Sequence, residues 1–326
     1  MICSKAKKSG RVADCMIILG RKYKFTKFEL DRLTRKFENI TIVPYRGRDP
    51  QAVLSEIRSC IEANKYTTIV LNTKSTVDGE IIKYLTNQQF DKSGSHLQIT
   101  TIEHFLEKHL HKCYIPEDNT DLHFLEDIHG YTIWQYIQKR VIDFFGIFWL
   151  FFFSWPVMLV CKINIKRQSP GPIYYAQYRV GVNNKEFKCV KFRSMRVDAE
   201  VDGAKFASEN DPRIFPWGEV MRKARFDELP QIWNILKGDM HLIGPRPERK
   251  VWTSEFEKII PYYSERHLVR PGVTGWAQVM YPYGANAEDA RQKLMYDLYY
   301  IKYWNIRLEL KIVWMTAMTV LYRKGM

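Results

Sequence analysis

One long stretch of the chain has no charged side chain, and it constrains the fold more than any other feature. It runs from Phe144 to Cys161 and reads FFGIFWLFFFSWPVMLVC. Its length is close to the minimum, about 17–18 residues, for a helix that crosses a bilayer. Apolar residues would cover every face of such a helix, which is typical of a helix surrounded by lipid. We therefore expect a membrane segment; the alternative is a core helix of a soluble protein.

Two features favour a segment that enters one leaflet and turns back. Basic residues flank it on both sides, namely Lys139, Arg140, Lys162, Lys166 and Arg167. Because positive charges favour the cytoplasmic side, both ends are expected there. Pro156 removes a helical hydrogen bond and clashes with the preceding turn, which kinks or breaks a helix. We expect a re-entrant helix over residues 134–168, and a straight span with a tolerated proline remains the alternative.

The N-terminal part alternates between two kinds of hydrophobic pattern. Short apolar runs such as VADCMIIL, ITIVP, TTIVLN and LQITT are separated by amphipathic stretches such as PQAVLSEIRSCIEA. This alternation predicts strands and helices in turn, and Asp49-Pro50 is a typical helix start. We predict a doubly wound, Rossmann-like α/β domain over residues 1–116. No GxGxxG motif follows the first strand, so we expect a structural or regulatory module without a dinucleotide cofactor.

The composition limits the partners and the compartment. Fifty Lys and Arg against 36 Asp and Glu give a net charge of +14. Such a surface attracts polyanions, which include nucleic acid, phosphorylated substrates and anionic lipid. The six cysteines are far apart and form no CxxC pair. This spacing fits a reducing, cytosolic environment, and the N-terminus has no apolar run long enough for an export signal.

The second half of the chain has a different character. The acidic stretch after Pro116 marks a linker over residues 117–133. Residues 169–326 are expected to form the catalytic domain, an α+β and mostly helical unit attached to the membrane. The segment from Ala287 to Met326 is rich in Tyr, Trp, Lys and Arg. This mixture suits interfacial amphipathic helices at the lipid headgroups, although ordinary core packing uses the same residues.

Two adjacent carboxylates, Asp227 and Glu228, stand just before a helical pattern in RFDELPQIWNILKGDM. One interpretation is structural: Asp227 caps the helix, and Pro230 occupies its first turn. The other interpretation is chemical, because a carboxylate can attack phosphorus and form an acyl phosphate. That reaction needs cations on the phosphoryl oxygens and a divalent metal between the anions. One carboxylate would then be the nucleophile, and the other would help to hold Mg²⁺.

The cations that favour the chemical interpretation occur in several motifs. Arg246 lies between two prolines in GPRP, Arg270 opens RPGVTGWAQ, Arg225 precedes the carboxylates, and Lys191 and Arg193 are two apart in KFRSM. Residues two apart share one face of a strand, and the arginine fork suits phosphate. We predict that these five side chains bind the phosphates of an anionic substrate, with an apolar partner reached through the membrane segment.

The chain from about Trp134 to Met326 resembles the bacterial sugar transferases, the monotopic polyprenyl-phosphate sugar-1-phosphate transferases. The resemblance rests on KRVID, KFRSM, DELPQIWNILKGDM, GPRPE, RPGVTGWAQV and YDLYYIKYWN, in this order. It implies transfer of a sugar phosphate from a UDP-sugar to undecaprenyl phosphate, with release of UMP and dependence on Mg²⁺. It also implies the cytoplasmic face of the inner membrane as the location, and a homodimer as the assembly.

The resemblance assigns roles to individual residues. Asp227 matches the nucleophile that forms a covalent phosphosugar intermediate, and Glu228 and Arg246 match the adjoining glutamate and the GPRP arginine. Both carboxylates are expected to contribute to the metal site. The re-entrant helix of the family is broken at a Ser-Pro step, which appears here as Ser154-Trp155-Pro156. Larger members carry four transmembrane helices as well as a Rossmann-like domain, so the role of residues 1–116 does not carry over.

Two other functions remain open. A non-catalytic membrane adaptor would bind anionic lipid through its basic surface and a protein through residues 1–116. A nucleic-acid binder rests on the net charge alone, and the apolar segment argues against it, so no nucleic-acid partner is expected. The loops 280–286 and 199–210 do not indicate which sugar the protein transfers.

Overall fold

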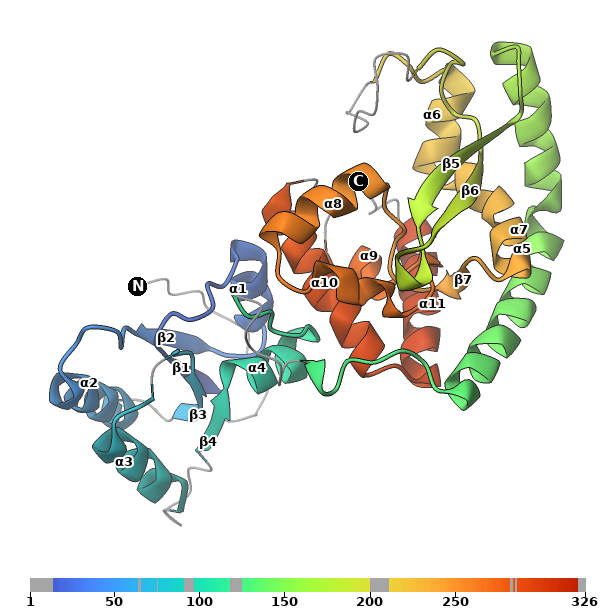
Figure 1. The fold of residues 1–326 in the computed structure, drawn as a ribbon. Helices are drawn as coiled ribbons and strands as arrows, with labels where there is room; N and C mark the ends of the chain where they lie inside the picture. The colour runs from blue at the N-terminus through green and yellow to red at the C-terminus, as the bar shows by residue number, and fades with distance from the viewer. Residues whose placement is uncertain are drawn as a thin grey trace. The chain divides into compact units, whose positions relative to one another are not determined.

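The computed structural model describes residues 14–63, 66–74, 76–90, 97–117, 125–199, 211–281, 284 and 286–321. Within the sequence, the chain divides into two compact units between Tyr114 and Ile115. Figure 1 shows the helices and strands of both units with their labels.

The N-terminal unit is built on a parallel sheet of four strands in the order β2-β1-β3-β4. The strands are β1 (Cys15–Leu19), β2 (Asn39–Val43), β3 (Tyr66–Leu71) and β4 (Gln98–Thr101). The helices are α1 (Lys27–Leu33), α2 (Pro50–Ala63), α3 (Gly79–Phe90) and α4 (Ile102–Phe105), which continues into a π-helical turn, η1 (Leu106–Leu110). The predicted alternation of strands and helices is confirmed. The Asp49 side chain also caps α2, because its Oδ2 accepts a hydrogen bond from the Ala52 amide at 3.0 Å.

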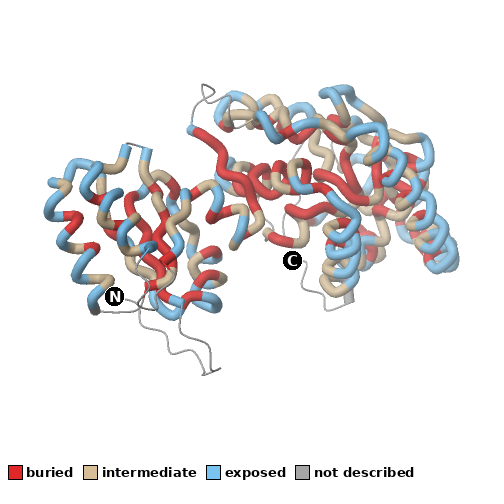
Figure 2. The backbone as a smooth tube through the Cα atoms, turned by 90° about the horizontal axis from the view of Figure 1, so that it is seen from below, coloured by how far each residue is buried: buried red, intermediate tan, exposed pale blue. Residues whose placement is uncertain are grey.

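Alternation along β1 separates the two faces of this sheet. Cys15, Ile17 and Leu19 pack in one cluster with residues of α2 and α3. Figure 1 shows α2 and α3 on one side of the sheet and α1 and α4 on the other. All of β1 and most of β3 are buried, whereas most residues of the edge strands β2 and β4 are not. Figure 2 shows the buried segments in the middle of this unit. The central strands of a parallel sheet covered on both faces have this pattern of continuous burial.

The N-terminal unit also buries an ion pair between Lys112 and Glu29, whose side chains are 0% and 1% exposed. The Tyr23 hydroxyl donates to Glu29 Oε1 at 2.8 Å, and Lys112 Nζ donates to that hydroxyl at 2.5 Å. Burying charges is costly unless they are paired and hydrogen-bonded, and here both conditions are met.

The C-terminal unit is mainly helical. Its helices are α5 (Ile133–Gln168), α6 (Pro216–Lys223), α7 (Ile232–Lys237), α8 (Lys250–Ile259), α9 (Trp276–Met280), α10 (Ala287–Lys302) and α11 (Ile306–Leu321). The 3₁₀ turns are η3 (Val182–Asn184), η4 (Phe226–Gln231) and η5 (Tyr263–Leu268). Strands β5 (Tyr174–Val180) and β6 (Glu186–Phe192) form an antiparallel hairpin, and β7 (His241–Ile243) pairs in parallel with β8 (Gly272–Thr274).

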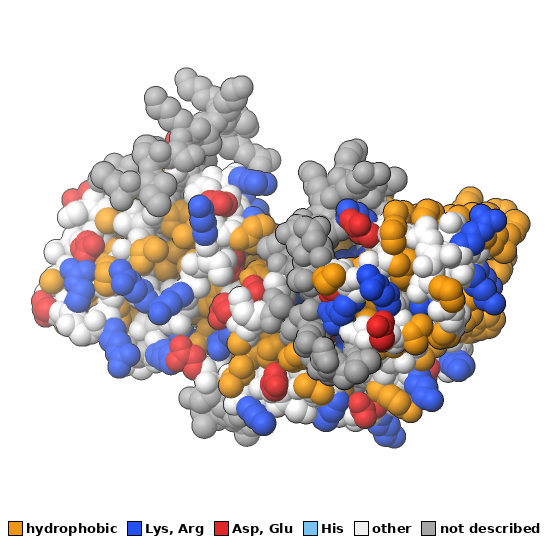
Figure 3. All heavy atoms as spheres, turned by 90° about the horizontal axis from the view of Figure 1, so that it is seen from above, with side chains coloured by type: hydrophobic (Ala, Val, Ile, Leu, Met, Phe, Trp, Pro, Cys, Tyr) orange, Lys and Arg blue, Asp and Glu red, His pale blue; other side chains and the backbone are white. Residues whose placement is uncertain are grey.

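Helix α5 contains the apolar stretch and buries only one stripe of its surface. The buried residues recur every three, four or seven positions: Lys139, Asp143, Ile147, Ser154, Met158, Cys161 and Ile165. The other faces expose large apolar side chains, such as Phe145 at 66% and Phe153 at 70%. Figure 3 shows hydrophobic side chains gathered at the right-hand edge, where α5 lies. This exposure argues against a core helix, and α5 is long and apolar enough to cross a membrane.

Pro156 lies inside α5, which is 36 residues long and continues on both sides of the proline. Of the two outcomes predicted at this proline, a break therefore does not occur within the described helix. Figure 1 shows α5 changing direction along its course, as expected for a helix with an internal proline. Ser154 is buried, and its Oγ has no hydrogen-bond partner among the described residues.

The two C-terminal helices differ in burial. Helix α10 buries most of its residues, including Tyr296, Asp297 and Tyr300, so its aromatic side chains serve core packing. Helix α11 instead exposes large apolar residues on part of its surface, among them Leu310 at 64% and Trp314 at 67%.

Candidate active site

The two adjacent carboxylates lie in a tight 3₁₀ turn. Turn η4 begins after Arg225, which adopts a left-handed φ of 58°, and it contains Asp227 and Glu228 in its first part. A non-glycine residue in this region of φ is uncommon and costs free energy, and such strain concentrates at functional sites. Arg225, rather than Asp227, is the N-cap, and no side chain makes a capping hydrogen bond there. The interpretation of Asp227 as a simple helix cap is therefore wrong.

Three cationic side chains lie close to one carboxylate oxygen of Glu228. Lys191 Nζ lies 2.9 Å, Arg246 Nη2 3.0 Å and Arg225 Nη1 3.9 Å from its Oε1. The three come from β6, from the loop after β7, and from the residue before η4. Burial alone would raise the pKa of Glu228, but Lys191 and Arg246 outweigh it and hold the pKa well below its usual range. Glu228 is therefore ionised at neutral pH and anchors the cations.

Asp227 has the opposite environment. It is partly buried, and its Oδ1 is buried without a hydrogen-bond partner among the described residues. Burial and the neighbouring charge of Glu228 raise the pKa of Asp227, although Lys191 and Arg222 partly offset them. An unpartnered buried carboxylate oxygen carries a desolvation cost. The pair therefore combines one carboxylate that holds cations with one whose oxygen is left free to react or to bind.

A small pocket lies beside two of the cations that bond to Glu228. Arg179, Cys189, Lys191, Gln231, Arg246, Pro247 and Gly272 line it. Two of its cations, Lys191 and Arg246, also bond to Glu228. Arg179 adds a third, which is held by Gln177 Oε1 at 2.8 Å and by Glu248 Oε2 at 3.6 Å. A concave surface with several convergent cations suits a phosphorylated ligand.

The structure brings some of the predicted phosphate-binding residues together and not others. Lys191, Arg225 and Arg246 meet at Glu228. Arg193 is instead 4% exposed, and it donates to the Ser169 hydroxyl at 2.6 Å and to the Pro172 carbonyl at 2.6 Å. Its guanidinium thus secures the turn between α5 and β5. Arg270 lies over the ring of Tyr136, with its Cζ 4.8 Å from the ring centroid.

Two residues of the pocket, Arg179 and Gln231, were not predicted from the sequence. Arg179 sits opposite Phe187 in the β5–β6 hairpin, and this register determines its direction. The signal available in the sequence was the alternation in YYAQYRV, which places Gln177 and Arg179 on one face of the strand. Gln231 ends η4, so its position depends on the 3₁₀ geometry, which the helical pattern did not indicate.

The expected Mg²⁺ needs oxygen ligands that are not already engaged. No group of three His, Cys, Asp or Glu side chains that could hold a metal occurs in the described part of the chain. Magnesium is commonly bound by only one or two carboxylates together with substrate phosphates and water. The unpartnered Oδ1 of Asp227 fits such a role, whereas Oε1 of Glu228 already accepts bonds from Lys191 and Arg246. The site therefore fits Mg²⁺ that arrives with phosphate.

The fold and the site together define a unit with a long, exposed apolar helix and an adjacent pair of carboxylates beside a cluster of cations. Residues 134–323 match the model of the bacterial sugar transferase family. The chain belongs to this family.

Several curated proteins are similar to this chain. A UDP-N-acetylgalactosamine-undecaprenyl-phosphate N-acetylgalactosaminephosphotransferase of Aeromonas hydrophila is 49% identical over 166 residues, which cover 51% of this chain and 39% of the relative. A UDP-glucose:undecaprenyl-phosphate glucose-1-phosphate transferase of Xanthomonas campestris pv. campestris is 38% identical over 60% of this chain and 40% of its own length. A putative undecaprenyl-phosphate N-acetylgalactosaminyl 1-phosphate transferase of Bacillus subtilis (strain 168) is 43% identical over 44% of this chain and 82% of its own. The matched part thus spans about two fifths of the first two relatives.

Proposed function

We propose that the protein transfers a sugar 1-phosphate from a UDP-sugar to undecaprenyl phosphate and releases UMP, as the first membrane step of polysaccharide assembly. The names of the relatives support this substrate pair. The observation that carries the proposal is the pair in η4, in which Glu228 anchors three cations beside the unpartnered oxygen of Asp227. This arrangement suits attack on a phosphorus whose oxygens are neutralised by cations.

In the first step, the Asp227 carboxylate attacks the phosphorus that bears the sugar. A carboxylate–phosphorus bond forms while the bond from this phosphorus to the bridging oxygen breaks, and UMP leaves with the electron pair. Glu228 holds Lys191 and Arg246 where they can contact the phosphoryl oxygens. Bound Mg²⁺, held by Asp227 and the phosphates, would neutralise charge on the diphosphate.

In the second step, a phosphate oxygen of undecaprenyl phosphate attacks the same phosphorus. The acyl phosphate bond breaks, the sugar phosphate passes to the lipid, and the Asp227 carboxylate is restored. Because the pair is partly enclosed, water is limited at the intermediate, which favours transfer over hydrolysis.

We also propose that α5 lies in one leaflet of the inner membrane with both ends at the cytoplasmic face. Its exposed aromatic side chains and the cations before and after the apolar stretch support this placement. The exposed apolar residues of α11, such as Leu310 and Trp314, would rest at the lipid interface. A cysteine introduced by Arg167→Cys should stay unlabelled by an impermeant thiol reagent added to intact cells, compared with the parent protein. Labelling from outside would contradict this topology.

The proposed activity is tested by measuring UMP release from a panel of UDP-sugars, with Mg²⁺ and with or without undecaprenyl phosphate. We expect sustained UMP release with at least one sugar, and only when the lipid phosphate is present. The panel should include the glucose and N-acetylgalactosamine nucleotides, because the relatives' names contain these sugars. Detergent-extracted protein that turns over no UDP-sugar would contradict the proposal and favour a membrane adaptor.

A further inference from the structure

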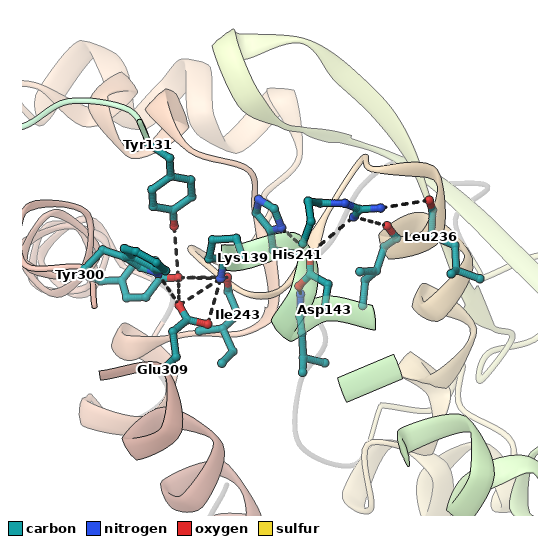
Figure 4. Close-up of polar contacts among 12 residues, drawn as sticks. Tyr131, Lys139, Asp143, Leu236, His241, Ile243, Tyr300 and Glu309 are labelled. Atoms are coloured by element: carbon teal, nitrogen blue, oxygen red, sulfur yellow. Dashed lines mark hydrogen bonds and ion pairs between the residues drawn. The ribbon is translucent and has the colours of Figure 1, made fainter. Parts of the chain in front are cut away.

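Two buried side chains near the start of α5 bond to the same short strand, β7. Lys139 and Asp143 are both 0% exposed, and their spacing of four residues places them on one face of the helix. Figure 4 shows both residues with their partners. Neither belongs to the site around Asp227, so their burial needs its own explanation.

Lys139 reaches the end of β7. Its Nζ donates to the Ile243 carbonyl at 2.7 Å, to the Tyr300 hydroxyl at 3.0 Å and to both carboxylate oxygens of Glu309 at 3.0 Å. Glu309 is 1% exposed and lies 170 residues away in the sequence, on α11. The ammonium therefore joins α5, α10 and α11 to one main-chain carbonyl of β7.

Glu309 is itself fully engaged. Its Oε1 accepts hydrogen bonds from the Tyr300 hydroxyl at 2.5 Å and from the Trp304 indole at 2.8 Å. The Tyr131 hydroxyl in turn lies 3.2 Å from that of Tyr300. These contacts hold the Glu309 carboxylate in one orientation. Because Lys139 Nζ is bonded to that carboxylate, its hydrogen bond to the Ile243 carbonyl is also held in one direction.

Asp143 holds the beginning of the same strand. Its Oδ1 accepts a hydrogen bond from the Leu242 amide at 2.8 Å, and its Oδ2 lies 2.5 Å from Nδ1 of His241. Burial lowers the pKa of His241 to about 4, so the ring is neutral and Nδ1–H donates to Asp143. All three residues of β7 are thus bonded to α5.

Strand β7 leads directly into the loop that carries Arg246. The loop is closely packed, because a Cβ atom at Gly244 would lie 2.6 Å from the Arg270 carbonyl oxygen. The Gly244 amide donates to the Thr274 carbonyl at 2.9 Å, and the Arg246 carbonyl accepts from Arg266 at 2.9 Å. A shift of β7 would therefore be passed to the Arg246 guanidinium, which lies 3.0 Å from Glu228.

We infer that Lys139 and Asp143 are positioning residues, which fix β7 from the base of the membrane helix and thereby aim Arg246 at Glu228 and the substrate phosphate. The inference rests on the proposed transferase function and adds that α5 helps to set the geometry of the active site as well as to attach the protein to lipid. Catalytic groups must be held within a fraction of an ångström, and a displacement of about 1 Å can cost about 10²-fold in rate.

The test replaces the Lys139–Glu309 pair without leaving a buried charge alone. In the double variant Lys139→Met with Glu309→Gln, the glutamine oxygen still accepts from Trp304 and Tyr300, so the fold should persist. We expect its kcat/KM for a UDP-sugar to fall by roughly 10- to 100-fold. We also expect Arg246→Lys to cost much less in this background than in the parent protein, because Arg246 is already misaligned. Unchanged kcat/KM with full sensitivity to Arg246→Lys would overturn the inference.

The N-terminal unit supplies a matched control. Lys112 and Glu29 form a buried pair of the same chemistry, which also includes a tyrosine hydroxyl. The double variant Lys112→Met with Glu29→Gln should lose a similar amount of thermal stability while kcat/KM stays within roughly 2-fold. An equal loss of activity in both double variants would indicate a general effect of stability and would overturn the positioning role.

Amide hydrogen exchange separates this inference from the proposed function, because it needs no substrate. In the Lys139→Met and Glu309→Gln double variant, peptides covering residues 241–248 should exchange faster than in the parent protein and in the matched control. Unchanged exchange there would overturn the inference even if UMP release is normal. Conversely, faster exchange in a protein that turns over no UDP-sugar would support the coupling of α5 to this loop and reject only the proposed function.

Discussion

Two buried glutamates in the C-terminal unit, Glu309 and Glu228, both form ion pairs, but the surroundings of the two pairs differ. Glu309 pairs with one fully buried lysine, and its other bonds come from neutral Tyr300 and Trp304. Glu228 instead gathers three cations that remain partly exposed, with side chains 21%, 34% and 47% accessible. The cluster around Glu309 is closed and balanced in charge. The cluster around Glu228 is open and carries excess positive charge, and beside it lies Asp227 with an unpartnered oxygen.

This difference shows how buried charge can serve either the fold or the chemistry. A closed pair leaves no capacity for a ligand, so its contribution is structural and geometric. An open cluster keeps donors available, and it acquires its full set of partners only when an anion binds. The comparison predicts different responses when each carboxylate is neutralised.

The largest expected effect is on catalysis, from Asp227→Asn. This change removes the nucleophile but keeps the size of the side chain, so turnover should fall by about 10³-fold or more. The rate of UMP release measures the effect. Asp127→Asn is a matched control, because Asp127 is 70% exposed and pairs with Lys302 at the surface. Substantial turnover by Asp227→Asn would remove Asp227 from the mechanism.

The next largest effect is on the free energy of unfolding, which should fall more when Glu309 is neutralised than when Glu228 is. Glu309→Gln leaves Lys139 buried without its counter-ion, which should cost about 3–5 kcal/mol in free energy of unfolding. Glu228→Gln leaves Lys191 and Arg246 partly solvated, so the cost should be only about 1–3 kcal/mol. Denaturant unfolding in detergent measures both values. Equal losses would mean that the open and closed clusters do not differ in the way described.

The smallest expected effect is on thermal stability, because substitutions of Asp227 and of Glu228 should shift the thermal midpoint in opposite directions. The raised pKa of Asp227 means that the folded protein holds this proton more tightly than the unfolded chain, so ionisation destabilises the fold as pH rises. Asp227→Asn should therefore raise the thermal midpoint at pH 7 by roughly 2–4 °C, and the gain should vanish below about pH 4. The pKa of Glu228 is lowered, so this residue stabilises the fold above its usual pKa and the contribution is lost as pH falls. Glu228→Gln should lower the midpoint at pH 7; a decrease for both variants would contradict the pKa directions.

Patterns that repeat along the chain predicted the N-terminal sheet and the long apolar helix. Short apolar runs between amphipathic stretches predicted the strands within residues 15–101, and the uncharged stretch predicted the middle of α5. The sequence also predicted that the carboxylate pair lies near the start of a helix. It did not predict the 3₁₀ geometry of this turn or the left-handed backbone of Arg225. Helical spacing in LPQIWNILK does not distinguish an α-helix from a 3₁₀ turn that precedes it.

Contacts between distant segments could not be predicted. Lys191 and Arg193 share the motif KFRSM, yet Lys191 reaches Glu228 and Arg193 turns to Ser169, because the strand ends between them at Phe192. In the sequence, Lys139 is one of the cations that flank the apolar stretch, whereas in the structure it pairs with Glu309 on α11, 170 residues further along the chain. Such pairings depend on tertiary packing, which no local pattern encodes.

The most direct test of the central claim is intact-protein mass spectrometry after incubation with a UDP-sugar and Mg²⁺ in the absence of undecaprenyl phosphate. The account predicts a mass increase equal to one sugar phosphate, located by peptide mapping on Asp227 and discharged when the lipid phosphate is added. Attachment to another side chain, or UMP release that requires no covalent adduct, would contradict it.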